Sequence, residues 1–183
     1  MPETDEERML AYAGGDTAAF EALYRKHRGA LYRFVLRSVR SAGEAEELFQ
    51  EIWMRVIEAR ARYAPSAKFT TWLYTIAHHR LVDHWRVRGL ALVSLDDGEG
   101  GAPEPAASPS HEPHRVVEAL QTRDRLAAAL AALPLAQREA FLLHHEGELT
   151  AREIAAATGT HEEAAKSRLR YATAKLKEAI ADG

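Results

Sequence analysis

Cysteine is absent from the 183-residue sequence. Its absence excludes a disulfide framework, a zinc site built on thiolates and a cysteine nucleophile, and it fits a reducing compartment. A secretory signal is also lacking, because the start, MPETDEE, is acidic where such a signal is basic and then apolar. The longest nearly apolar stretch, Leu126 to Ala136, has 11 residues and contains Pro134, whereas a membrane-spanning helix needs about 20. We therefore expect a cytoplasmic protein without membrane insertion.

Recognisable catalytic motifs are missing too. The sequence has no glycine-rich phosphate loop and no serine–histidine–aspartate arrangement. Histidines do gather near Asp83, and His79 lies one helical turn before it, a spacing that metal sites use. In metal-dependent phosphohydrolases, however, the adjacent pair runs histidine then aspartate, whereas here it is Asp83–His84, and the surrounding bases would repel a cation. We predict no enzymatic activity, no metal and no cofactor.

Charge is nearly balanced, with 24 basic against 27 acidic residues and a formal charge of −3, but it is unevenly distributed. Residues 41–52 hold four acids and no base, residues 55–88 hold seven bases against two acids, and residues 166–177 hold five bases and no acid. Because nucleic-acid binding depends on where charge lies and not on its sum, the two cationic segments are candidates for DNA contact.

One stretch interrupts an otherwise helical pattern. Residues 98–113, GEGGAPEPAASPSHEP, contain four prolines and three glycines and can be neither a helix nor the interior of a strand. So polar a stretch cannot bury enough apolar surface to offset the entropy of ordering it. We therefore predict an all-α fold of two small helical domains, residues 1–90 and 116–183, joined by a flexible Gly/Pro-rich linker at residues 91–115.

Apolar residues of the first domain recur at three- and four-residue steps, the spacing of one helix face. Asp16 is a predicted N-cap, and Ser41 with Glu44 three residues later has capping-box spacing. Trp72 and Ile76 are predicted to pack in the core. Helices are predicted within residues 6–13, 20–35, 41–56 and 69–88.

The second domain has the pattern of a helix-turn-helix. Helices are predicted over residues 116–133 and 135–145, separated by Pro134. Two capping boxes follow, Thr150 with Glu153 and Thr160 with Glu163. A short helix, a turn containing a glycine and a basic helix are typical of this DNA-binding motif. The residues predicted to be buried on the basic helix are Ala165, Leu169, Ala172 and Leu176.

Taken together and in this order, three passages resemble a sigma-70 family RNA polymerase sigma factor of the extracytoplasmic-function (ECF) type. They are EELFQEIW at residues 46–53, FTTWLYTIAHHRLVDHWR at residues 69–86, and Leu133–Pro134 followed by Glu153–Ala155 and Lys166–Leu169. The resemblance covers nearly the whole chain. It implies a transcription initiation factor that binds core RNA polymerase and directs it to promoter DNA.

The resemblance implies that the first passage docks on the clamp helices of the polymerase β′ subunit, with the β subunit as a further partner, and that an anti-sigma factor regulates the chain. An acidic face can complement a basic helical pair, although charge alone would favour a solvated helix face, and the docking role depends on the neighbouring passages. The implied docking residues are Glu46, Glu47, Gln50, Glu51 and Trp53.

The second passage resembles the segment that recognises and melts the promoter −10 element. Single-stranded DNA requires cations for its phosphates and flat or polar groups for its bases. Where related proteins commonly have an asparagine that selects a flipped base, this chain has His79, which can still read a base edge with an altered preference. The side chains implied to contact the −10 element are Arg60, Arg62, Lys68, His78, His79, Arg80, Arg86 and Arg88.

The helix-turn-helix resembles the domain that reads the −35 element. The family's usual Thr-Val before Lys-Ser-Arg is replaced here by Ala164–Ala165, and Glu163 is expected to fold back on Thr160. The alternative is a stand-alone helix-turn-helix regulator that binds duplex DNA without polymerase. The side chains implied to contact the −35 element are Thr150, Lys166, Ser167, Arg168, Arg170 and Tyr171.

Overall fold

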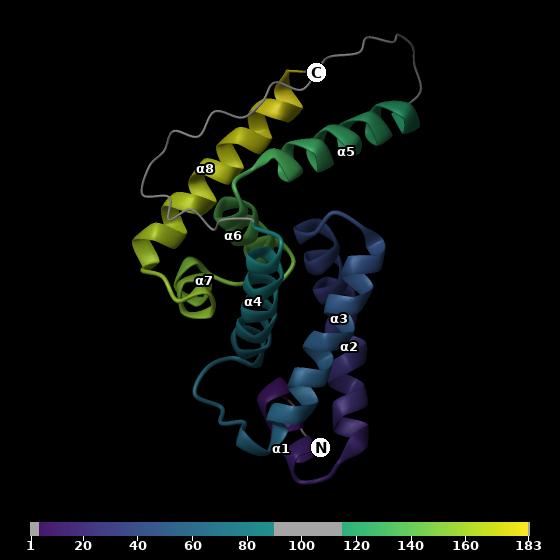
Figure 1. The fold of residues 1–183 in the computed structure, drawn as a ribbon, viewed down its shortest axis with the longest axis vertical. Coiled ribbons are helices and arrows are strands. Elements are labelled where there is room, and N and C mark those ends of the chain that lie inside the picture. Colours follow the sequence, from purple (N-terminus) through teal and green to yellow (C-terminus); the bar gives the residue numbers. More distant parts are fainter. Residues whose placement is uncertain (1–3, 90–114, 183) are drawn as a thin grey trace.

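The computed structural model describes residues 4–89 and 115–182. All regular structure in these residues is helical, which confirms the predicted fold class (Figure 1). Except for Arg115, the predicted linker at 91–115 lies outside the described residues. None of the helices in the described residues has both the length and the apolar character of a membrane-spanning segment. The elements are α1 (Asp5–Ala13), α2 (Thr17–Ser38), α3 (Ala42–Ala59), the 3-10 helix η1 (Arg60–Arg62), α4 (Phe69–Val87), α5 (Arg115–Ala132), α6 (Leu135–His145), α7 (Ala151–Thr158) and α8 (Glu162–Ala181).

Helices α1–α4 form the N-terminal lobe, and their starts follow from the predicted caps. Asp16 accepts hydrogen bonds from the backbone of Ala18 and Ala19 at the start of α2, and Ser41 accepts one from Glu44 at the start of α3. The core of the lobe contains the fully buried side chains of Phe34 and other apolar residues of α2, α3 and α4. Burying each such side chain stabilises the fold by about 1.5–3 kcal/mol.

Helices α5–α8 form the C-terminal lobe, in which α7 and α8 are the predicted helix-turn-helix. Thr150 and Glu153 form the complete capping box, with hydrogen bonds of 2.8 and 3.2 Å. Gly159 ends α7 with φ of 67°, a left-handed conformation that glycine adopts without strain. Ala165, Ala172 and Leu176 are buried as predicted, whereas Leu169 is only half-buried.

The second predicted capping box, Thr160 with Glu163, is wrong. Helix α8 begins one residue later than that pattern requires, so His161 is its N-cap and provides no side-chain hydrogen bond. The Thr160 hydroxyl lies 3.3 Å from the Thr158 hydroxyl instead. Glu163 accepts a hydrogen bond from Lys166, and its charge therefore lies on the outer face of α8.

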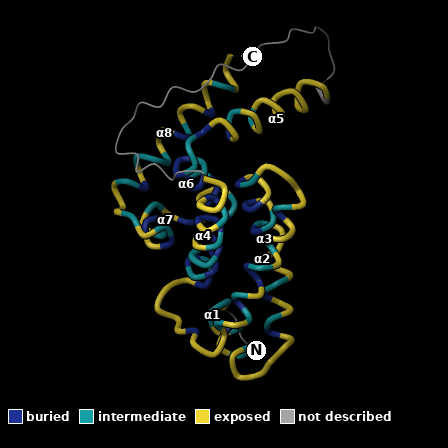
Figure 2. The backbone as a smooth tube through the Cα atoms, in the orientation of Figure 1, coloured by how far each residue is buried: buried dark blue, intermediate teal, exposed yellow. Residues whose placement is uncertain are grey.

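The two lobes pack directly on each other. Helix α7 lies beside α4 and contacts it, and α6 and the end of α5 contact α2 (Figure 1). The contact is tight at Gly147, where an added Cβ would lie 2.8 Å from the Leu143 carbonyl oxygen and 3.0 Å from the Tyr74 ring. Most of α5, by contrast, is exposed (Figure 2). The lobes therefore meet through α2 and α4 on one side and α6 and α7 on the other.

Candidate functional site

Helix α4 carries four of the eight side chains predicted to contact the −10 element, His78, His79, Arg80 and Arg86, and it presents three faces. Leu73, Ala77 and Leu81 are fully buried in the core. His78, the residue after Ala77, faces the C-terminal lobe and is 9% exposed. The third face is open, since His79 on it is exposed. Because the faces of a helix are fixed by its 3.6-residue period, the adjacent residues His78 and His79 have opposite environments.

The open face also contains residues that the sequence alone did not assign to a site. Trp72 and Ile76 were predicted to pack in the core, but both are only half-buried, and they precede His79 on this face at helical spacing. The Trp72 ring packs edge-on against buried Tyr63, with centroids 4.9 Å apart. An indole, an aliphatic side chain and an imidazole thus share one accessible stripe that continues to the exposed Arg86. The same spacing is typical of a core face, which is why the sequence could not distinguish the two.

The acidic face of α3 divides into free and paired residues. Glu46, Glu47 and Gln50 are exposed, and no ion pair joins them to another described residue. Glu51 is different, because its carboxylate pairs with the Arg80 guanidinium on α4. Trp53 is buried: its ring packs against Phe20 and Tyr24, and its indole nitrogen has no hydrogen-bond partner among the described residues.

Further ion pairs tie α3 to α4. Arg88 pairs with Glu44, and Arg55 lies 3.5 Å from Asp83. Arg80, the partner of Glu51, is also close to His84, whose pKa is lowered first by burial and then by that guanidinium. The helix predicted to dock on polymerase and the helix predicted to read the −10 element are therefore one electrostatically connected unit, and α3 positions the bases of α4.

Three glutamates of the C-terminal lobe, spaced at regular intervals along the chain, reach across to the N-terminal lobe. Glu139 Oε1 lies 2.5 Å from His78 Nδ1, and both side chains are buried. Glu146, whose side chain is 9% exposed, pairs with Arg33 and Arg37 on α2. Removing one partner of the buried His78–Glu139 pair leaves an uncompensated polar group in the interior and is strongly destabilising.

The third glutamate, Glu153, lies 2.8 Å from the Lys68 ammonium group, just before α4 begins. The hydrogen bond to Glu153 raises the pKa of Lys68. Burial alone would raise the pKa of Glu153, but the hydrogen bonds from Lys68 and Thr150 outweigh it, and the pKa is lowered. Lys68 and His78, both predicted to contact the −10 element, thus each contact an acid of the C-terminal lobe.

The remaining bases predicted to contact the −10 element are more open. Arg62 and Arg86 are exposed and form no ion pair with another described residue. Arg60 is exposed as well, but its guanidinium lies over the Tyr12 ring, 5.7 Å from the centroid, and donates to the Ile57 carbonyl. The basic side chains available to a phosphate therefore lie in η1 and at the end of α4.

Helix α8 carries five of the six side chains predicted to contact the −35 element. Lys166 is exposed but lies 3.3 Å from Glu162 and 3.2 Å from Glu163, and their hydrogen bonds raise its pKa. Arg170 and Tyr171 are exposed, with the guanidinium 5.5 Å from the ring centroid. Ser167 and Arg168 are half-buried, and the sixth residue, Thr150, uses its hydroxyl to cap α7.

Known proteins resemble both lobes. The profile of Sigma-70 region 2 matches residues 23–90, and that of Sigma-70, region 4 matches residues 123–176. The ECF RNA polymerase sigma factor RpoE of Cereibacter sphaeroides is 34% identical over 169 residues, which cover 89% of this chain and 87% of that protein. The RNA polymerase sigma factor CarQ of Myxococcus xanthus is 30% identical over 95% of this chain and 96% of its own.

Solved structures agree with this relationship. The sigma factor RpoE of Bartonella quintana, in complex with the anti-sigma factor NepR, has a TM-score of 0.65 and 25% identity, covering 88% of this chain and 96% of that one. CnrH, in complex with the cytosolic domain of CnrY, has a TM-score of 0.70 over 97% of both chains at 20% identity, and so supports the fold alone. The two profiles and the relatives that span nearly the whole chain establish its family: the protein belongs to the ECF sigma factors of the sigma-70 family, which direct RNA polymerase to promoters.

Proposed function

We propose that the N-terminal lobe binds core RNA polymerase through Glu46, Glu47 and Gln50 and recognises the −10 element with the open face of α4, while α8 reads the −35 element. The observation that carries this proposal is the open face itself, on which Trp72, Ile76 and His79 lie between exposed bases. Flat side chains beside cations are what unstacked bases and their phosphates require. The predicted domain limits, 1–90 and 116–183, would then separate the two readers.

The chain's own residues are proposed to act only by binding. Nucleotide addition would belong to the polymerase, which is consistent with a family of non-enzymatic initiation factors. Among the described residues no group of three or more potential metal ligands is close enough to hold an ion. The protein would act in the cytoplasm, with core RNA polymerase.

The packed lobes are proposed to be the resting arrangement of the free protein. DNA cannot reach His78 while Glu139 covers it, and the charge of Lys68 is balanced by Glu153 while the lobes are packed. Polymerase binding would separate the lobes and uncover the side chains that contact the −10 element. An anti-sigma factor would regulate this step, in keeping with the complex of Bartonella quintana RpoE with NepR.

The function is tested by run-off transcription from fragmented genomic DNA with purified core polymerase, with and without this protein, followed by sequencing of the transcript starts. We expect new starts that share paired −35 and −10 motifs, because two readers held on one polymerase gain from their linked binding. If core polymerase gains no starts while the protein alone shifts duplex DNA, the stand-alone regulator is the correct function.

A second prediction concerns α8. Replacing Lys166 and Arg170 by alanine is expected to lower binding to the −35 element and to reduce the slope of log affinity against log salt by about 1–2, since each lost phosphate contact removes about 0.9. Arg170 should account for most of the change, because Lys166 is already paired with two glutamates. The measurement is salt-dependent binding of holoenzyme to a promoter fragment. Lys175→Ala, exposed on the opposite side of α8, is the matched control, and an unaltered slope in the double variant would assign DNA binding to another face.

A further inference from the structure

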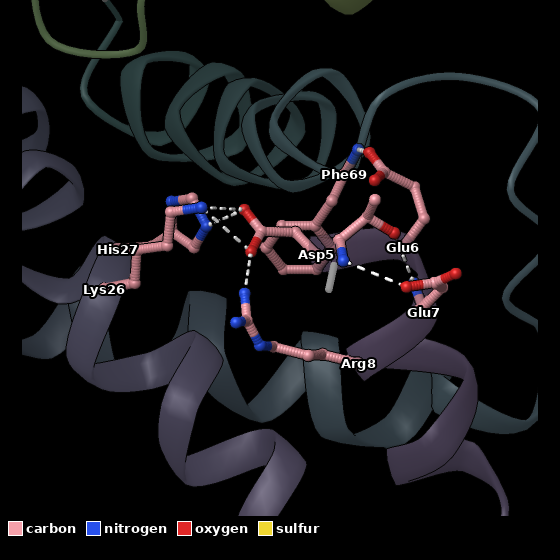
Figure 3. A network of polar contacts seen from close by, with 8 residues as sticks. Asp5, Glu6, Glu7, Arg8, Lys26, His27 and Phe69 are labelled. Atoms are coloured by element: carbon pink, nitrogen blue, oxygen red, sulfur yellow. Dashed lines mark hydrogen bonds and ion pairs between the residues drawn. The ribbon is translucent and has the colours of Figure 1, made fainter. Parts of the chain in front are cut away.

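Helix α1 contacts α2, η1 and α4. Asp5, in its first turn, accepts hydrogen bonds from Lys26 at 2.9 Å and from Arg8 at 2.9 Å, and lies 2.7 Å from His27 Nε2 (Figure 3). Burial alone would raise the pKa of Asp5, but Lys26 and His27 outweigh it and lower the pKa. The carboxylate is thus ionised at neutral pH and fastens α1 to α2.

The next residue, Glu6, reaches a different element. Its Oε1 accepts a hydrogen bond of 2.6 Å from the backbone N–H of Phe69, the first residue of α4 (Figure 3). The N-cap residue of α4, Lys68, offers no side-chain hydrogen bond to the helix. The first backbone N–H groups of a helix otherwise have no intrahelical partner, and a carboxylate there is favoured by the helix dipole. A side chain of α1 therefore caps α4 from 63 residues away.

Between η1 and α4, the loop of residues 63–68 is anchored at both ends by this arrangement. At its start, Tyr63 is buried against Trp72, and the pKa of its hydroxyl is raised to about 12 by burial and then by Glu6 and Asp5. Just before it, Arg60 lies over the Tyr12 ring of α1. At its end is the Glu6–Phe69 hydrogen bond. The residues in the middle of the loop, 64–68, are exposed.

We propose that Glu6 is a positioning residue for promoter opening: by capping α4, it holds the loop of residues 63–68 and the first turn of α4 in the arrangement that receives the melted strand of the −10 element. This inference rests on the function proposed above for α4. Lys68 ends the loop and Trp72 lies one turn beyond it, so both depend on where α4 begins. Glu6 itself, a carboxylate turned into the fold, has no direct part in holding DNA phosphates.

The test compares Glu6→Ala with Glu6→Gln in reconstituted holoenzyme, on a promoter found with the wild-type protein. Alanine removes the acceptor, whereas the glutamine side-chain oxygen can still accept from Phe69 N–H. We expect Glu6→Ala to slow open-complex formation, followed by permanganate reactivity of melted thymines, by about tenfold, the loss expected when a helix cap is removed. Glu6→Gln should stay within about threefold of wild type, because a neutral acceptor retains the bond.

Two further readouts separate positioning from general destabilisation. Core affinity and binding to the −35 element should be unchanged in Glu6→Ala, and hydrogen exchange of the α4 first turn should rise in the free protein. Glu21→Ala, which removes only an exposed acid from α2, is the control and should behave as wild type. The proposal would be overturned if Glu6→Ala formed open complexes as fast as wild type, or if Glu6→Gln slowed their formation as much as Glu6→Ala does. It would also be overturned if Glu6→Ala lost core affinity to the same extent as it lost the rate of open-complex formation.

Failure of the proposed function gives a different result. If wild-type holoenzyme opens no promoter, the assignment of α4 to the −10 element is wrong, and hydrogen exchange at Phe69 still reports whether Glu6 caps the helix. If the wild type opens promoters but exchange of the α4 first turn is the same in Glu6→Ala, the cap has no effect on α4 and the positioning role is wrong while the function stands.

Discussion

Replacing Glu46, Glu47 and Gln50 together by alanine is expected to weaken binding to core RNA polymerase by about 30-fold, since losing one interface hot spot among the three costs about 2 kcal/mol. All three are exposed on α3 and form no ion pair with another described residue, so the folded chain should lose little stability. Alanine is also the best helix former, and α3 should persist. The measurement is core affinity by fluorescence anisotropy, with circular dichroism to confirm the fold.

Glu51 is left unchanged in that experiment for a structural reason. It pairs with Arg80 on α4, and its removal would free a base of the surface proposed for the −10 element as well as an acid of the docking surface. Glu58, exposed near the end of α3, is the matched control, and Glu58→Ala should bind core as wild type does. An unchanged core affinity in the triple variant would remove the docking role of this face.

Reversing the charge of Arg33 and Arg37 is expected to open the free protein. In the double variant to glutamate, the nearly buried Glu146 would face two acids instead of two bases. Leaving such a group unsatisfied costs about 2 kcal/mol or more, which shifts the closing equilibrium about 30-fold. The free variant should therefore expand in small-angle X-ray scattering and bind a single-stranded oligonucleotide carrying the −10 element more tightly than wild type.

Restoring complementarity provides the decisive control. Adding Glu146→Arg to the double variant rebuilds the pairs with opposite polarity, and it should compact the protein and weaken its oligonucleotide binding again. Arg25→Glu, on the same helix, should leave the lobes closed, because among residues 4–89 and 115–182 Arg25 pairs only with the exposed Glu21. If the double variant scatters as wild type does and binds no better, the pairs of Glu146 with Arg33 and Arg37 do not govern access to the surface proposed to read the −10 element.

Local chemistry accounts for what the sequence could predict. Periodicity locates helices because it reports which residues share a face, and the caps at Asp16, Ser41 and Thr150 need only near neighbours in the chain. The predicted capping box at Thr160 was wrong because α8 begins one residue later, so Thr160 is not its N-cap. No local sequence signal determines that start. The family resemblance, spread over both lobes, identified the class of protein.

Contacts between distant residues could not be predicted in the same way. Glu139 pairs with His78 across 61 residues, and Glu146 with Arg33 across 113. Nothing in a helical pattern distinguishes a glutamate that crosses to another lobe from one in water. The burial of Trp53 could not be predicted either. Its place in the docking passage suggested a surface role, whereas its ring is packed against aromatic rings of α2.

Glu153 makes two contacts at once, and this lowers the entropic cost of closing the lobes. One carboxylate oxygen accepts from the Thr150 backbone in the capping box, and the other meets Lys68. A free glutamate side chain loses about 1.5–2 kcal/mol of rotamer entropy when it is fixed. In Glu153 that ordering has already occurred when α7 folds, so within this pair only Lys68 must be immobilised when the lobes meet. When polymerase binding separates the lobes, as proposed, this acceptor would stay in place while the helix-turn-helix stays folded.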